Sequence, residues 1–303
     1  MTSTTTAFRV LSTATLLTLG ASAAAQAASV TPDVIFGSGN LNGSYTLDTG
    51  SYVSSALVPV IGPLSTSTNT TTPIETNLEI GLRAKLRFDE FNRPRNIFNQ
   101  SGSTYTFDAG AAPGGFGFDA NSPTTPVWNF EWSVTTDLDR DMPIPGATSL
   151  SALTYELRID GDAGVGVNFA KFDPIKIARA DHALGNLLTG NGDGVVSGSA
   201  AEYQANLAKY SVAQNSWSYE FFNEPTDGAF LPELAAFDPS EDGTYRIEFE
   251  AFFDGKSVAS TGIDVVVGNG ATPVPSPVPV PAALPLLAAA LGGLAAIRRR
   301  KRA

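Results

Sequence analysis

The sequence contains no cysteine, a single histidine and two methionines. Without cysteine the fold cannot rely on disulfides, and thiol catalysis and cysteine-based zinc or iron–sulfur sites are excluded. The one histidine, His182, would have to serve any Ser-His-Asp triad. No G-x-S-x-G motif is present to position a serine, and no H-E-x-x-H motif is present to bind zinc. We therefore interpret His182 as a surface or turn residue.

The first 27 residues have the composition of a secretory signal peptide. Arg9 precedes an apolar stretch at residues 10–19, and small residues then lead to Ala25-Gln26-Ala27, which matches an A-x-A cleavage site. The apolar stretch is too short to span a membrane in the mature protein. The sequence therefore predicts export of a mature chain that begins at Ala28 and faces away from the cytosol.

Residues 282–303 have the composition of a short membrane segment with a basic end. Residues 282–297 are sixteen positions without a charge. As a helix they would cover about 24 Å, a little less than a hydrocarbon core of about 30 Å. A block of five basic residues follows and would be held on the cytoplasmic side: Arg298, Arg299, Arg300, Lys301 and Arg302. Residues 272–281 alternate with proline and predict an extended spacer between the body and the membrane.

The C-terminal segment resembles a known sorting signal. Its motif is Val278-Pro279-Val280-Pro281-Ala282, followed by the Leu/Ala/Gly-rich helix and the arginine-rich end. This order resembles the VPLPA-type variant of the PEP-CTERM signals of Gram-negative bacteria, with Val280 where the family pattern has leucine. The resemblance implies recognition by an exosortase-type membrane protease, removal of the helix, and association with exopolysaccharide or the outer surface. The body is only loosely similar to domains that accompany this signal.

The body between the two signals is strongly acidic. The chain has 19 basic and 30 acidic residues, and six of the basic ones lie in the terminal segments, so residues 28–271 keep 13 basic residues and a net charge of −17. A charge of this size and sign favours solubility and argues against nucleic acid or anionic lipid as a partner. About 250 residues are enough to bury a core without disulfides.

Several stretches of the body alternate apolar and polar residues with a period of two, which predicts half-buried β-strands. They cover residues 78–88, 128–134, 153–159, 245–253 and 258–267. Asp254-Gly255 predicts a hairpin turn between the last two, and residues 65–72 are interpreted as a loop. The alternation places Trp128 and Trp132 in the core, and the only helical candidate is residues 199–209.

Half-buried alternation favours antiparallel sheets, and two stacked sheets form a sandwich. We therefore expect an all-β protein whose body, residues 28–271, is an antiparallel, jelly-roll-like β-sandwich. The signal peptide occupies residues 1–27, the proline-rich spacer with the sorting motif residues 272–281, and the transmembrane sorting helix with its basic tail residues 282–303.

Calcium is the only cofactor that the residue patterns suggest. Residues 189–200 place Asn191 and Asp193 two apart, followed by glycine, as in the middle of an EF-hand or dockerin loop. Thr189 stands where the first aspartate belongs and Ala200 where a bidentate glutamate belongs, so an Asx/Gly turn is the other interpretation. Two aspartate groups at strand ends could also hold calcium: Asp137, Asp139 and Asp141, and separately Asp160 and Asp162.

Five of the thirteen basic residues of the body gather in one region, at Arg83, Lys85, Arg87, Arg93 and Arg95. The alternation places the first three on the solvent face of their strand. They could grip an acidic polysaccharide, or pair with carboxylates on neighbouring strands.

The sequence predicts an exported, exosortase-sorted surface or matrix protein that has no catalysis of its own. It would act structurally or bind an extracellular polysaccharide, after a transient stay in the inner membrane. One alternative is a secreted carbohydrate-active hydrolase that uses an Asp/Glu pair. Glu248 and Glu250 share one strand face, but that face is interpreted as solvated. The other alternative is a permanently tail-anchored surface protein.

Overall fold

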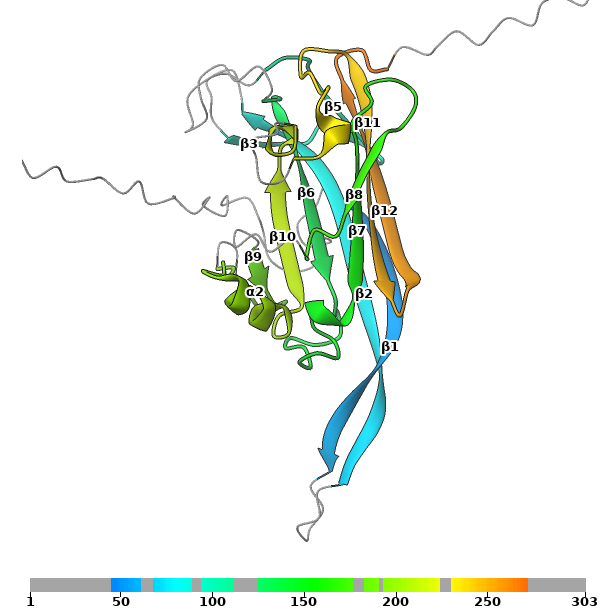
Figure 1. Cartoon of the computed structure of the whole chain (residues 1–303), viewed down its shortest axis with the longest axis vertical. Helices are drawn as coiled ribbons and strands as arrows, with labels where there is room; N and C mark the ends of the chain where they lie inside the picture. The colour runs from blue at the N-terminus through cyan, green and yellow to red at the C-terminus, as the bar shows by residue number, and fades with distance from the viewer. Residues whose placement is uncertain are drawn as a thin grey trace, which may run out of the picture.

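The computed structural model describes residues 45–60, 68–88, 94–111, 125–176, 183–190, 193–223 and 230–271. Within these ranges the chain is mostly β-structure, arranged in two sheets in which nearly all strand pairs are antiparallel (Figure 1). The expected all-β class is therefore confirmed.

The first sheet has six strands, in the order β1-β2-β6-β10-β9 with β3 also paired to β2. Every pair in it is antiparallel. Its strands are β1 (Thr46–Val60), β2 (Thr68–Phe88), β3 (Pro94–Ile97), β6 (Trp128–Thr135), β9 (Ala183–Gly185) and β10 (Val212–Trp217).

The second sheet also has six strands, in the order β4-β5-β12-β11-β7-β8. One pair departs from the expected antiparallel arrangement, because β5 runs parallel to β12. Its strands are β4 (Gln100–Ser101), β5 (Thr104–Phe107), β7 (Thr154–Asp160), β8 (Phe169–Phe172), β11 (Gly243–Phe253) and β12 (Lys256–Val267).

The β11–β12 hairpin forms as its turn residues predict. Asp254 and Gly255 have φ values of 49° and 73°. Two successive positive φ values give the type I′ turn, whose twist matches that of the flanking strands. Exposure alternates along both strands as expected.

Helical structure is short. Helix α2 (Ala200–Leu207) lies inside the predicted range, and the Ser199 hydroxyl accepts a hydrogen bond from the Glu202 N–H at 3.2 Å, which caps its first turn. The described residues also form three single turns of 3₁₀ helix: η1 (Leu150–Ala152), η2 (Tyr219–Phe221) and η3 (Pro232–Leu234).

The interpretation of residues 65–72 as a loop is wrong for its second half. Residues 68–72 belong to β2 and pair with residues 56–60 of β1, at the far end of a ladder that continues without interruption to Thr46 and Leu82. Threonine suits an extended strand because its branched side chain packs well there, so a Ser/Thr-rich run is compatible with either structure.

The two sheets share one core, in which aromatic side chains from both sheets meet. The Trp132 ring lies 5.9 Å from that of Phe249, and the Trp128 ring lies 6.1 Å from that of Tyr245. Both tryptophans are fully buried, as the alternation predicted. The sheets also meet directly where β1 crosses β12: a Cβ atom on Gly50 would lie 1.7 Å from the Val258 carbonyl oxygen, so only glycine fits there.

Helices long and apolar enough to span a membrane are absent from the described ranges. Residues 1–27 and 272–303, which carry the predicted signal peptide, spacer, sorting motif and basic stop, lie outside them.

Candidate functional site

The basic residues of β2 do not lie on a solvent face, and this prediction is wrong. Arg83 is 1 % exposed and Lys85 is 4 % exposed, and the neighbouring strand β6 is buried along its whole length. Both faces of the first sheet are therefore covered in this region. Arg83 and Lys85 are not surface groups that could grip a polysaccharide.

These cations instead converge on one carboxylate of the adjacent strand. Arg83 Nε donates to Glu131 Oε2, and Lys85 Nζ lies 2.7 Å from Glu131 Oε1. The register places Arg83 directly opposite Glu131. The other interpretation, pairing with a carboxylate on a neighbouring strand, is therefore the correct one. We call Arg83, Lys85 and Glu131 the buried ion cluster.

Aromatic rings cover the cluster. The Arg83 guanidinium carbon lies 4.3 Å from the centre of the Tyr45 ring and 4.9 Å from that of Phe98, which are cation–π distances. Burial lowers the pKa of Arg83, but the charges of Tyr45 and Glu131 raise it, and the pKa ends above its ordinary value. The guanidinium therefore stays charged inside the protein.

Arg87 forms a second ion pair beside the cluster. Its Nη1 donates to Glu220 Oε1, while the Thr125 hydroxyl donates to the other oxygen of that carboxylate. Burial lowers the pKa of Arg87, and Glu220 offsets only part of this effect. Arg93 lies outside the described residues, and the side chain of Arg95 lies outside the described side chains.

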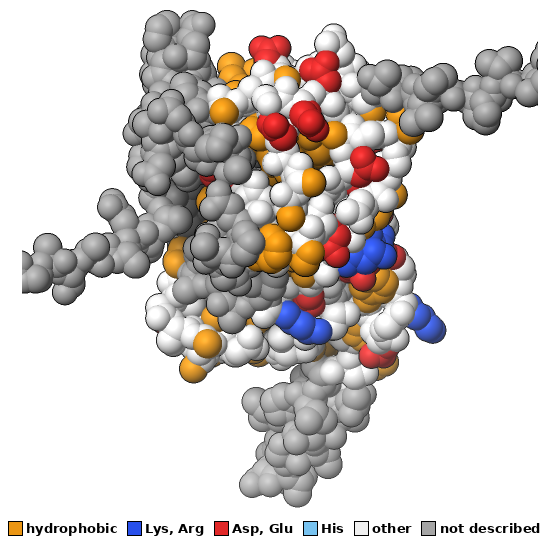
Figure 2. Space-filling model, turned by 45° about the horizontal axis from the view of Figure 1, so that its top comes forward, with side chains coloured by type: hydrophobic (Ala, Val, Ile, Leu, Met, Phe, Trp, Pro, Cys, Tyr) orange, Lys and Arg blue, Asp and Glu red, His pale blue; other side chains and the backbone are white. Residues whose placement is uncertain are grey.

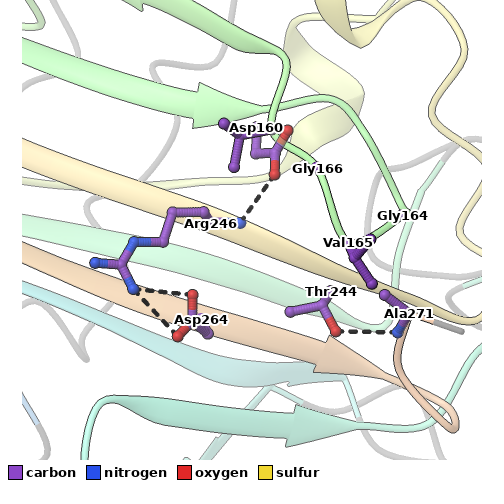
Figure 3. Close-up of a pocket in the computed structure, with 9 residues that line it drawn as sticks. Asp160, Gly164, Val165, Gly166, Thr244, Arg246, Asp264 and Ala271 are labelled. Carbon is purple, nitrogen blue, oxygen red and sulfur yellow. Dashed lines mark hydrogen bonds and ion pairs between the residues drawn. The ribbon is translucent and has the colours of Figure 1, made fainter. Parts of the chain in front are cut away.

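A pocket of about 320 Å³ opens at one end of the second sheet (Figure 3). Val165 and Val167 line it from the loop between β7 and β8, and both are more than half exposed. Arg246 projects from β11 toward Asp264 on β12, with Nη1 at 3.1 and 3.2 Å from the two carboxylate oxygens. The remaining lining residues are Asp160, Gly164, Gly166, Thr244 and Ala271.

Asp160, one of the calcium candidates, lines this pocket and accepts hydrogen bonds from the backbone around it. Its Oδ1 accepts the N–H groups of Asp162 and Asn168 at 3.0 and 2.7 Å, and its Oδ2 accepts the Arg246 N–H at 3.4 Å. Burial raises the pKa of Asp160, and these three hydrogen bonds oppose the rise. The Asp162 carboxylate accepts the Gly164 N–H at 2.8 Å. Both carboxylates therefore shape the loop, while Arg246 neutralises Asp264 on the strand side of the pocket.

The other acidic group also holds a loop in place. Asp139 accepts both the backbone N–H and the side-chain amide of Asn77, each at 2.9 Å, and Asp137 pairs with Arg140 at 3.1 Å. The bonds to Asn77 join the loop after β6 to β2, and the Asp137–Arg140 pair holds the loop itself. Groups of three or more histidine, aspartate or glutamate side chains gathered as metal ligands do not occur among the described residues.

The EF-hand-like stretch is only partly described. Asn191 lies outside the described residues. The Asp193 N–H donates to the Gly190 carbonyl at 3.0 Å, and the Thr189 hydroxyl accepts the Asn186 N–H at 2.9 Å. These bonds are those of a turn between β9 and α2, and calcium binding by Asn191 and Asp193 stays a prediction. His182 also lies outside the described residues.

The carboxylate pair Glu248 and Glu250 is held by one arginine. Arg158 Nη1 lies 3.0 Å from Glu248 and Nη2 lies 2.6 Å from Glu250. Burial raises the pKa of Glu250, but hydrogen bonds from Ser257 and Arg158 outweigh it and leave the pKa below its usual value. A glycosidase general acid needs the opposite, a raised pKa. Glu250 therefore does not have the electrostatics of a catalytic acid.

Asp139 provides a test of these loop contacts. Hydrogen bonds from the Asn77 backbone and side chain lower the pKa of Asp139 below its ordinary value. A carboxyl group with a depressed folded-state pKa stabilises the fold above the unfolded pKa, and this contribution is lost as pH falls through the folded pKa. We expect Asp139→Asn to flatten the loss of stability below about pH 4 in urea unfolding at stepped pH. Asp141→Asn makes the same charge change in the same loop, and an equal effect there would contradict the assignment to Asp139.

No family model matches the chain, and neither a curated protein nor a solved structure matches it.

Proposed function

We propose that the protein is exported and sorted to the cell surface or extracellular matrix of a Gram-negative bacterium, with a jelly-roll-like β-sandwich body. In this proposal the signal peptide is cleaved after Ala27, and an exosortase-type protease recognises residues 278–282 while residues 282–303 hold the chain in the inner membrane. The body then acts structurally or associates with an exopolysaccharide, without catalysis of its own.

The observation that carries the non-catalytic part is the internal pairing of charges. The cations of β2 neutralise Glu131 and Glu220, Arg158 neutralises the carboxylates on β11, and Arg246 neutralises Asp264. A catalytic pair needs groups whose pKa values are pushed apart and left open to substrate. Paired charges instead support the fold, as suits a structural or binding protein.

The acidic surface supports an extracellular role without nucleic acid. On the face shown in Figure 2, acidic side chains are spread over the body among apolar and uncharged ones. Such a surface repels other polyanions and keeps a secreted protein soluble. A polysaccharide partner would therefore bind through uncharged side chains, such as Val165 and Val167 at the pocket.

Intact mass analysis of the protein from its native envelope and medium tests the sorting proposal. We expect a chain that begins at Ala28 and ends near Ala282. A mass that retains Arg302 in mature surface protein would contradict sorting cleavage and favour permanent tail anchoring.

A glycan screen tests the role of the body. We expect retention on extracellular polysaccharide, or no interaction, with no release of reducing ends. Release of reducing ends by the purified protein would favour the hydrolase alternative.

A further inference from the structure

The β1–β2 hairpin extends beyond the two sheets as a two-stranded arm (Figure 1). Strand β6 pairs with β2 only from Glu79 onward, whereas the β1–β2 ladder continues to Val60 and Thr68. The loop after β6 covers the edge of β2 as far as Asn77, whose carbonyl accepts the Leu138 N–H at 2.8 Å. Beyond that point the described strands leave both edges of the arm without a neighbouring strand.

The arm also contains the longest uncharged stretch of the body. Residues 49–74 contain no Asp, Glu, Lys, Arg or His, in a chain with a formal net charge of −11. Natural proteins protect open strand edges with charged side chains, especially lysine. The β1 strand of the arm has none, and the β2 strand has only Glu75, opposite Val53. A two-stranded ribbon is marginally stable in water, so such an arm gains most from a further strand.

The outward-facing backbone groups follow from the register. The N–H and carbonyl of Asn77 both bond to the loop after β6, so Asn77 faces away from β1. Alternate residues of a strand face the same edge. Pro73 therefore also faces outward, and its missing N–H interrupts the β2 edge.

The β1 edge is the more continuous of the two. Ser51 is opposite Asn77 and Ser55 is opposite Pro73 in the ladder. Residues opposite outward-facing ones in an antiparallel pair also face outward. The outer edge of β1 thus presents N–H and carbonyl groups from every second residue between positions 51 and 57, before Pro59 ends the series. Ser51, Val53 and Ser55 have exposed side chains.

We propose that the outer edge of β1, residues 51–57, pairs antiparallel with the same edge of a second copy of this chain. An antiparallel pair of identical edges has twofold symmetry, so the surface is complementary to itself. A second copy fits better than a charged partner, because residues 49–74 carry no charge. Two acidic bodies can therefore pair through this stretch without placing like charges directly opposite each other. Pro73 interrupts the outer edge of β2. Because a further copy cannot pair along that edge, the assembly stops at a dimer. The inference does not depend on either terminal signal.

The test compares the full-length chain with edge variants by analytical ultracentrifugation in a mild detergent. Any association through the apolar tail is common to all variants. Ser55→Lys places a charge on the edge, and Val53→Pro removes one outward N–H without removing a hydrogen bond to β2. Ser101→Lys makes the same change as Ser55→Lys at an exposed position of β4, an edge strand of the second sheet. Circular dichroism checks that each variant is folded.

We expect the wild type and Ser101→Lys to sediment as dimers at micromolar concentration, and both edge variants to raise the dissociation constant at least tenfold. In wild type, hydrogen exchange of peptides covering residues 50–58 should slow as protein concentration rises. A monomeric wild type, or folded edge variants that dimerise as wild type does, would overturn the proposal. Protection of residues 50–58 only when extracellular polymer is added would also overturn it and assign the edge to that polymer.

Discussion

Replacing Glu131 with glutamine is expected to lower the free energy of unfolding by about 3–5 kcal/mol. Glu131 is fully buried between Arg83 and Lys85, which are themselves almost inaccessible to water. Glutamine keeps the size of the side chain but removes the negative charge, leaving two cations in the interior with no carboxylate to neutralise them. Urea unfolding followed by tryptophan fluorescence measures the effect.

Two further variants establish the cause. Glu156→Gln removes a half-buried carboxylate that pairs with Arg158 at 2.5 Å, and we expect a loss of at most about 1 kcal/mol because that pair is close to water. Replacing the whole buried ion cluster by apolar residues (Arg83→Met, Lys85→Met and Glu131→Leu) should recover most of the stability lost in Glu131→Gln. If Glu131→Gln lowers the free energy of unfolding by no more than Glu156→Gln does, the charges of the buried ion cluster are not isolated from water.

The second large effect is expected from Trp132→Ala, at about 3–5 kcal/mol. The Trp132 side chain is fully buried, and its ring lies 5.4 Å from that of Trp217 and 5.9 Å from that of Phe249 on the facing sheet. Truncation to alanine removes this contact between the two layers and leaves a cavity that rigid strands on both sides cannot close. Thermal and urea unfolding give the loss, and near-ultraviolet circular dichroism reports the change in aromatic packing.

Val165→Ala is the control for that experiment. Val165 is more than half exposed in the loop beside the pocket, so removing its two methyl groups should change stability by no more than about 0.5 kcal/mol. If Trp132→Ala lowered the free energy of unfolding by no more than Val165→Ala does, the Trp132 side chain would not hold the two sheets together.

Local patterns predicted much of the β-structure correctly. Strands β6, β7, β11 and β12 coincide with the stretches of period two, and β2 contains the fifth. The Asp254-Gly255 turn and the short helix also form where expected, because turn chemistry and capping depend on residues adjacent in sequence.

Local sequence patterns did not predict the buried ion cluster. The alternation places Arg83 and Lys85 on the polar face of their strand. It does not show whether that face contacts water or a buried carboxylate. Only the register between β2 and β6 brings Glu131 to them. The closest signal in the sequence was the position of Glu131 between Phe130 and Trp132, on a strand that proved to be covered on both faces.

By itself the sequence determined the all-β class, the strands with a clear period of two, the exclusion of cysteine chemistry and the acidic character of the body. These properties depend on composition and on spacing over a few residues. Tertiary structure decided which polar face is buried, which carboxylate neutralises which cation, the parallel pairing of β5 with β12, and the length of the β1–β2 arm. Each of these depends on strand pairing between residues far apart in the chain, and a period of two is the same for every partner and for both faces of a sheet.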